Sequence, residues 1–213
     1  MSDLLPSSFA LAGFAAAVIV LALTPGPDMM LYLSKTITQS RRAGAASLAG
    51  ALSGLLVHTA LAAVGLSALL AASATAFTIL KIAGAAYLLW LAWDALRHGS
   101  SFSLAPGAAA ERLSRLYLRG LLVNLLNPKI IVFFLTFLPQ FVAAGDPNAP
   151  ARLVILGVAF VVIALPISIA QILAAGAIAR LLRRSPSVTR GVDFLFAGVM
   201  AAFAARLVFS QGK

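Results

Sequence analysis

The chain has 213 residues, of which 62% are hydrophobic and only 10% are charged. Soluble domains carry about 25% charged residues, so this composition excludes an ordinary soluble protein and indicates an integral membrane protein. Sixteen Lys and Arg residues against six Asp and Glu residues give a formal net charge of +10. The basic residues lie in short segments between apolar runs, which is typical of membrane proteins, and we therefore expect no nucleic-acid partner.

The sequence contains none of the residue patterns that carry common enzyme chemistry. It has no cysteine, and its only two histidines are His58 and His98. The absence of cysteine excludes disulfides and thiolate metal sites. No HExxH, P-loop or GxSxG motif is present in the sequence. We therefore expect a protein that is not an enzyme and that uses no metal or cofactor.

Six apolar stretches approach or exceed the length of about 20 residues that a bilayer-spanning helix needs. They run from about 9 to 34, 44 to 66, 76 to 96, 120 to 142, 153 to 179 and 192 to 209. Because Asp3 precedes the first run and no basic residue does, we expect the first helix to be retained rather than cleaved as a signal peptide. The sequence thus predicts an all-α integral membrane protein with six transmembrane helices in one domain.

The basic residues between the runs predict the orientation. Eleven of them follow the first, third and fifth runs: Lys35, Arg41, Arg42, Arg97, Arg112, Arg115, Arg119, Arg180, Arg183, Arg184 and Arg190. The other side has only Arg152 and Lys213. Since the more basic side faces the cytoplasm, both termini are expected on the periplasmic or extracellular side. In the long connection at 98–119, residues 108–118 form either a short interfacial helix or part of a linker.

The first apolar run is interrupted by Thr24, Pro25, Gly26, Pro27 and Asp28. The prolines remove backbone donors and the glycine permits unusual dihedral angles, so a regular helix cannot pass through undisturbed. Within a bilayer, broken backbone is tolerated only where protein or a watery cavity satisfies it. We therefore interpret this break, with its intramembrane carboxylate, as part of a binding site.

The fourth run contains a second break, with Asn124, Asn127, Pro128 and Lys129. Each half of the chain, about 9–97 and about 120–210, then has one helix broken at proline followed by two unbroken helices. Three spans is an odd number, so the halves must insert with opposite orientation and form an inverted repeat. The breaks fall at similar depths, which places the expected substrate or ion site between them.

The charged residues of the two breaks have two interpretations. In the functional one, Asp28 binds an amine or titrates a proton, and Lys129 offers a cation to a carboxylate. In the structural one, the two residues form an ion pair that holds the half-helices together. For Asn127, which precedes a proline, the simplest role is to cap the broken helix.

A stripe of small residues marks the second run. Ala46, Gly50, Gly54 and His58 recur every four residues, so they share one helix face. This face serves close packing, either within one chain or in a homodimer, and a proton-relay role for His58 is the alternative. In the fifth run, Gln171 either lines the cavity or forms an interhelix hydrogen bond.

In combination these landmarks resemble the LysE/RhtB family of amino-acid exporters. The resemblance rests on the Thr24 to Asp28 segment, the glycine and histidine stripe, the segment from Lys81 to Leu88, and the segment from Gly120 to Lys129 followed by Phe133 and Phe134. It implies a secondary transporter of the bacterial inner membrane that exports amino acids or close analogues, by antiport with protons as the coupling ion. The residues by themselves leave two alternatives: an exporter of another small solute or ion, and a non-transporting or lipid-handling membrane protein.

Overall fold

The computed structural model describes residues 8–66, 74–98, 111–143, 146–184 and 186–209. Every regular element in these ranges is helical, which confirms the predicted all-α class. The elements in chain order are α1 (Ser8–Leu23), α2 (Pro27–Thr38), α3 (Arg41–Leu61), η2 (Ala62–Leu66), α5 (Ala74–His98), α6 (Leu113–Leu125), α7 (Pro128–Val132), η3 (Phe133–Phe137), η4 (Leu138–Phe141), α8 (Ala149–Leu173), α9 (Ala175–Arg184) and α10 (Pro186–Phe209).

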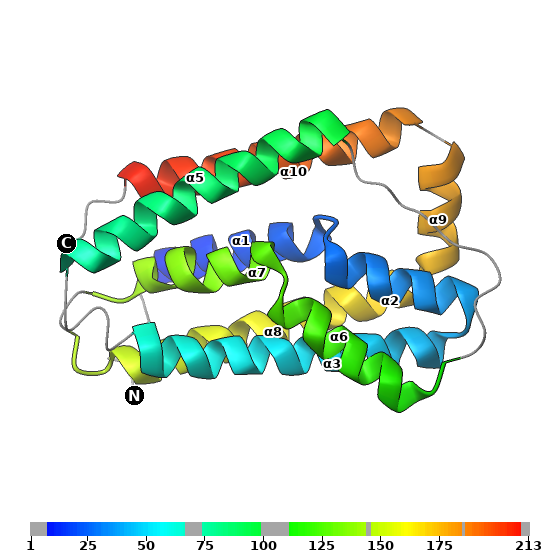
Figure 1. Ribbon diagram of the computed structural model, residues 1–213, viewed down its shortest axis with the longest axis horizontal. Helices are drawn as coiled ribbons and strands as arrows, with labels where there is room; N and C mark the ends of the chain where they lie inside the picture. Colours follow the sequence, from blue (N-terminus) through cyan, green and yellow to red (C-terminus); the bar gives the residue numbers. More distant parts are fainter. Residues whose placement is uncertain (1–7, 67–73, 99–110, 144–145, 185, 210–213) are drawn as a thin grey trace.

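The helices form an elongated bundle (Figure 1). Helices α5 and α10 run side by side along one edge, and α3 and α8 run along the opposite edge, where α6 crosses α3. Helix α1 packs on α8, and α2 packs on α3. Helices α1 and α7 lie in the middle of the molecule, between these two edges.

Both predicted breaks are present and have nearly the same geometry. Helix α1 and helix α2 are bent by 48° at the first break, and α6 and the helical segment Pro128–Phe141 are bent by 49° at the second. Two further helical stretches, Arg41–Gly65 and Ala149–Leu173, are long and apolar enough to cross a membrane on their own. The described residues thus provide two unbroken candidate spans, or four if each bent pair forms one span.

Two predicted boundaries are wrong. The fifth run was expected to continue to residue 179, but α8 ends at Leu173 and α9 starts separately at Ala175. Helix α9 is amphipathic and carries Arg180, so it does not continue the apolar α8. After its break the second half therefore has two long helices, α8 and α10, with the short helix α9 between them. Helix α6 also begins earlier than expected, at Leu113, so residues 113–118 belong to it; residues 99–110 of the same connection lie outside the described residues.

Phenylalanine rings fill the core between α1, α8 and the second broken helix. Phe133 lies 6.3 Å from Phe14 of α1 and 5.2 Å from Phe160 of α8, measured between ring centroids. All three side chains are buried. Offset and edge-on aromatic pairs at these distances are favourable beyond the area that they bury. This packing joins η3 to α1 and α8.

Helices α3 and α6 cross at very close range through reciprocal glycines. A Cβ atom added to Gly50 would lie 1.9 Å from the Tyr117 carbonyl oxygen, and one added to Gly120 would lie 2.0 Å from the Ser47 carbonyl oxygen. The absence of a side chain at each glycine thus allows the backbone of the opposite helix to approach closely. The Gly50 face is therefore occupied by packing within the chain.

The substitution Gly50→Ala should lower the free energy of unfolding by about 2 kcal/mol or more, because the new methyl group meets backbone that cannot move aside cheaply. The matched control is Gly198→Ala on α10, where an added Cβ meets nothing within 4 Å. Because alanine favours helix by roughly 0.5–1 kcal/mol, the control should be neutral or slightly stabilising. Thermal unfolding in detergent compares the two variants, and equal effects would contradict the close crossing.

Candidate substrate site at the two helix breaks

The first break positions a carboxylate at the beginning of a new helix. Gly26 is the N-cap of α2, Pro27 is its first residue and Asp28 lies in its first turn, where a negative charge is favourable. The φ of Gly26 is −162°, an extended conformation that any residue adopts, so Gly26 does not use the unusual dihedral angles that glycine permits. What Gly26 provides is space, because an added Cβ would lie 2.9 Å from Lys129 Nζ.

Asp28 is held by both asparagines of the second break. The side-chain amides of Asn124 and Asn127 donate to its Oδ2 at 2.7 and 2.9 Å. Its other oxygen, Oδ1, is buried and accepts no hydrogen bond from the described residues. The Oδ1 atom of Asn124 is also buried without a donor. Two acceptors at one place therefore lack a donor, which is costly unless a ligand or water supplies it.

Asn124 is positioned by α3. A Cβ atom added to Gly54 would lie 2.4 Å from its Oδ1 atom, so the glycine makes room for the amide. The His58 Nε2 atom lies 3.3 Å from the Asn124 carbonyl oxygen, and the His58 ring packs on Phe134 at 5.5 Å between centroids. His58 is thus linked to Asp28 through Asn124, an arrangement compatible with packing and with proton relay alike.

Asn127 and Lys129 organise the second break. The Oδ1 atom of Asn127 accepts from the Lys129 N–H at 3.0 Å, which confirms the expected cap at the beginning of α7. Lys129 is 8% exposed, and its ammonium donates to the carbonyls of Leu21 at 3.1 Å and Thr24 at 3.0 Å. These carbonyls lie at the C-terminal end of α1, which favours a cation.

The two charges therefore do not form the direct ion pair considered above. Asp28 of the first break contacts the second break, and Lys129 of the second break contacts the end of α1. The end of α1 leaves backbone carbonyls unpaired, and the Lys129 ammonium satisfies two of them. The Asp28 carboxylate instead accepts from the side-chain amides of the second break. Each break therefore supplies side chains that hydrogen-bond to groups at the other break.

A cavity of about 60 Å³ lies beside Asp28, Asn124 and Lys129. Tyr32 and Ser168 contribute polar groups to its lining. The Tyr32 hydroxyl donates to Gln171 Oε1, and the Gln171 amide donates to the Ala22 carbonyl at 3.1 Å, so Gln171 ties α8 to the first broken helix. A cavity of this volume has room for a few water molecules.

Tyr32 and Ser168 are site residues that the sequence analysis missed. The available signal for Tyr32 is its position four residues after Asp28, which places both on one face of α2. Ser168 has no comparable signal. No group of three or more His, Cys, Asp or Glu side chains within the described residues has a metal-binding arrangement.

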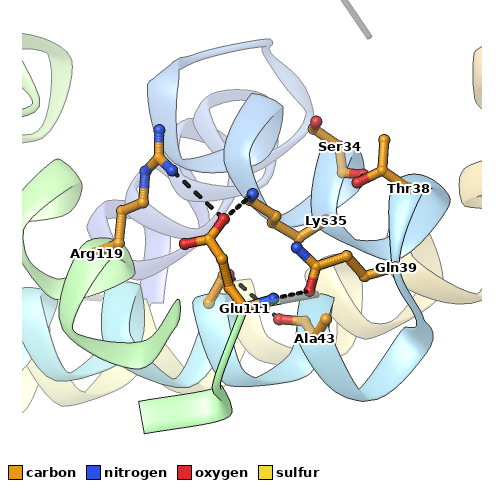
Figure 2. Close-up of polar contacts among 8 residues, drawn as sticks. Ser34, Lys35, Thr38, Gln39, Ala43, Glu111 and Arg119 are labelled. Carbon is orange, nitrogen blue, oxygen red and sulfur yellow. Dashed lines mark hydrogen bonds and ion pairs between the residues drawn. The ribbon is translucent and has the colours of Figure 1, made fainter. Parts of the chain in front are cut away.

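A second polar cluster, formed by Lys35, Gln39, Glu111 and Arg119, lies at the other end of α2 (Figure 2). Glu111 forms an ion pair with Lys35, and its Oε1 atom lies 3.7 Å from Arg119 Nη1. The Glu111 backbone N–H donates to Gln39 Oε1 at 3.2 Å. The hydrogen bond from Lys35 is the main cause that holds the pKa of Glu111 below its usual value. The carboxylate is therefore charged at neutral pH.

The sequence analysis gave Lys35 and Arg119 only a role in orientation, and it assigned no role to Glu111. Lys35 is nevertheless 8% exposed, nearly as buried as the residues of the core. The sequence separation of 76 residues between Lys35 and Glu111 hides the contact. The one sequence feature that could have pointed to this cluster is Glu111, which is the single glutamate of the chain.

Known proteins with similar sequences include several named as efflux proteins. A homoserine/homoserine lactone efflux protein of Salmonella typhi is 40% identical over 144 residues, which are 68% of this chain and 69% of the relative. A leucine efflux protein of Klebsiella pneumoniae is 29% identical over 211 residues, 93% of this chain and 94% of the relative. A threonine efflux protein of Escherichia coli K12 is 30% identical over 132 residues, 60% and 63% of the two chains.

No solved structure shows a significant match. The family model described as LysE type translocator matches residues 19–211, a range that includes both helix breaks, the cavity between them and the Lys35 cluster. The resemblance seen in the sequence motifs is thereby confirmed over most of the chain. The chain belongs to the LysE type translocator family.

Proposed function

We propose that this protein is a secondary transporter that exports amino acids or close analogues from the bacterial cytoplasm and binds them between the two helix breaks. One observation carries the proposal: Asp28 Oδ1 and Asn124 Oδ1 are buried acceptors without donors, next to a cavity. An ammonium group has three donors and no acceptor, and so matches this pair. Family membership and the names of the relatives support an amino acid as the source of that ammonium.

The carboxylate of the substrate is expected near Lys129 and the backbone N–H groups at the beginning of α2. Both lie close to the amine position, since Lys129 Nζ lies beside Gly26 and Asp28 follows two residues later. Helix beginnings favour negative charge, and broken helices in transporters use them for anionic substrate groups. The site thus offers separate places for the two charged groups of a zwitterion.

The transport cycle proposed here uses alternating access. Six spans form two inverted three-helix repeats, residues about 9–97 and about 120–210, in a single transport domain of the inner membrane with both termini outside. The similar bends of 48° and 49° at the two breaks support a structural repeat. Rocking of the repeats enlarges the cavity toward one side and then the other. Protonation of Asp28 from outside, which releases the amine, is the coupling step of the proposed antiport.

Counterflow into proteoliposomes tests the function. We expect uptake of radiolabelled L-homoserine, L-threonine or L-leucine, the compounds named for the relatives, when the same amino acid is preloaded. Inorganic ions and lipophilic cations serve as controls for an exporter of another solute. Counterflow of those controls without counterflow of amino acids would overturn the substrate class. The absence of any flux would favour the non-transporting alternative.

A further inference from the structure

We infer that Lys35, Gln39 and Arg119 form a second binding site, specific for the carboxylate of the substrate, and that Glu111 occupies it in this conformation. The inference rests on the proposed export function. It places a carboxylate-binding site in front of the substrate site on its cytoplasmic side, where Lys35 is expected from the distribution of basic residues. Figure 2 shows the three side chains arranged around the Glu111 carboxyl and backbone.

The cluster has more donors than acceptors. Lys35 and Arg119 both approach the same Glu111 oxygen, Oε1. Gln39 uses its Oε1 to accept from the Glu111 backbone, and this contact leaves its amide Nε2 buried without an acceptor. A single carboxylate therefore does not satisfy the donors present. Cationic and amide donors without enough acceptors are what a carboxylate ligand requires.

The hydrogen-bonding imbalance of this cluster is opposite to that of the substrate site. Buried acceptors lack a donor at Asp28 and Asn124, whereas a buried donor, Gln39 Nε2, lacks an acceptor in the Lys35 cluster. An amino acid carries both complementary groups. Lys35 follows Asp28 by seven residues, which is two helical turns and about 10.5 Å along α2, so the two residues share a face. Because an α-amino acid is much shorter than this, it binds the two sites in succession rather than together.

Glu111 is suited to act as a displaceable occupant. It lies before the beginning of α6 and its side chain is 20% exposed, whereas the Lys35 side chain is 10% exposed. Both side chains are thus largely buried, and a largely buried ion pair is costly to break unless another group takes the place of the lost partner. An incoming carboxylate that forms the same contacts therefore displaces Glu111 at little cost. Removal of the Glu111 charge should then help a carboxylate substrate to bind, and removal of the Lys35 charge should hinder it.

Uptake into inside-out membrane vesicles measures binding from the cytoplasmic face. For L-homoserine, Glu111→Gln should lower the half-saturating concentration about twofold to fivefold, and Lys35→Gln should raise it by a similar factor. L-homoserine lactone has no free carboxylate, so neither variant should shift its value. The matched control is Asp146→Asn, which removes the acid that precedes α8 and pairs with Arg152 at 2.6 Å. Shifts of both variants in the same direction, or equal shifts for the lactone, would show a purely structural ion pair.

A second measurement needs no transport. Labelling of the Lys35 amine by trinitrobenzenesulfonate, followed by peptide mass spectrometry, should increase in Glu111→Gln and decrease again when L-homoserine, but not its lactone, is added. Lack of protection by L-homoserine would overturn the carboxylate site. Protection without any amino-acid flux would instead leave this site standing and overturn the export function, so the two failures are distinguishable.

Discussion

Replacement of Asp28 by asparagine is expected to reduce export by about 10- to 100-fold. The substrate ammonium loses its charged acceptor, and hydrogen bonds to charged groups are worth about 1.5–3 kcal/mol, with 1.4 kcal/mol for each factor of ten. In the native protein the amides of Asn124 and Asn127 donate to Asp28. An asparagine at position 28 also carries an amide donor, which cannot accept from these two amides. The measurement is the initial rate of amino-acid counterflow per reconstituted protein.

The control for this variant is Asp146→Asn, which removes one negative charge at a turn far along the chain, before α8. It should leave the counterflow rate unchanged. Thermal unfolding of Asp28→Asn in detergent separates loss of transport from loss of fold. If Asp28→Asn exported amino acids at the normal rate, the assignment of the amine-binding and coupling carboxylate would be incorrect.

The substitution Lys129→Met is expected to lower the free energy of unfolding by about 3 kcal/mol. The Lys129 ammonium is the donor to the Leu21 and Thr24 carbonyls, and each buried acceptor left without a donor costs ~1–3 kcal/mol. The side chain also satisfies the C-terminal end of α1, where a positive charge is favourable. Methionine has a similar length but no donor, so the loss is electrostatic rather than a loss of volume.

Thermal unfolding in detergent, compared with Arg42→Met, provides the test. Arg42 is an exposed basic residue near the beginning of α3, so its replacement should change stability little. A normal melting temperature for Lys129→Met would contradict the role of Lys129 in joining the breaks. If that normal stability came with lost export, Lys129 would act on the substrate alone.

The positions of both helix breaks could be predicted because proline leaves a direct mark on the sequence. Pro25, Pro27 and Pro128 lack backbone donors, and the charged residues Asp28 and Lys129 directly follow the last two of them. The same local chemistry predicted that Asn127 caps a helix. In each case the evidence lies within a few residues along the chain, where steric and hydrogen-bonding rules are strongest.

Contacts across the fold could not be predicted in this way. Opposite charges at similar depth suggested a pair between Asp28 and Lys129, whereas each finds partners among amides or carbonyls that carry no net charge. The partners of Lys35 and Tyr32, Glu111 and Gln171, are 76 and 139 residues away. Hydropathy also continued through the junction of α8 and α9, because it measures composition and not the direction of the helix axis.

The reciprocal contacts between the breaks have a consequence for energy conservation. Asp28 and Lys129 each keep the opposite half of the protein in place while no cargo is bound. An empty carrier that moved its halves apart would strand both charges in a poorly solvated interior. A zwitterion can replace both sets of contacts at once and so lower the free-energy cost of the movement. Under the proposed function, Asp28 and Lys129 would thereby suppress futile cycling and the leak of protons that it would cause.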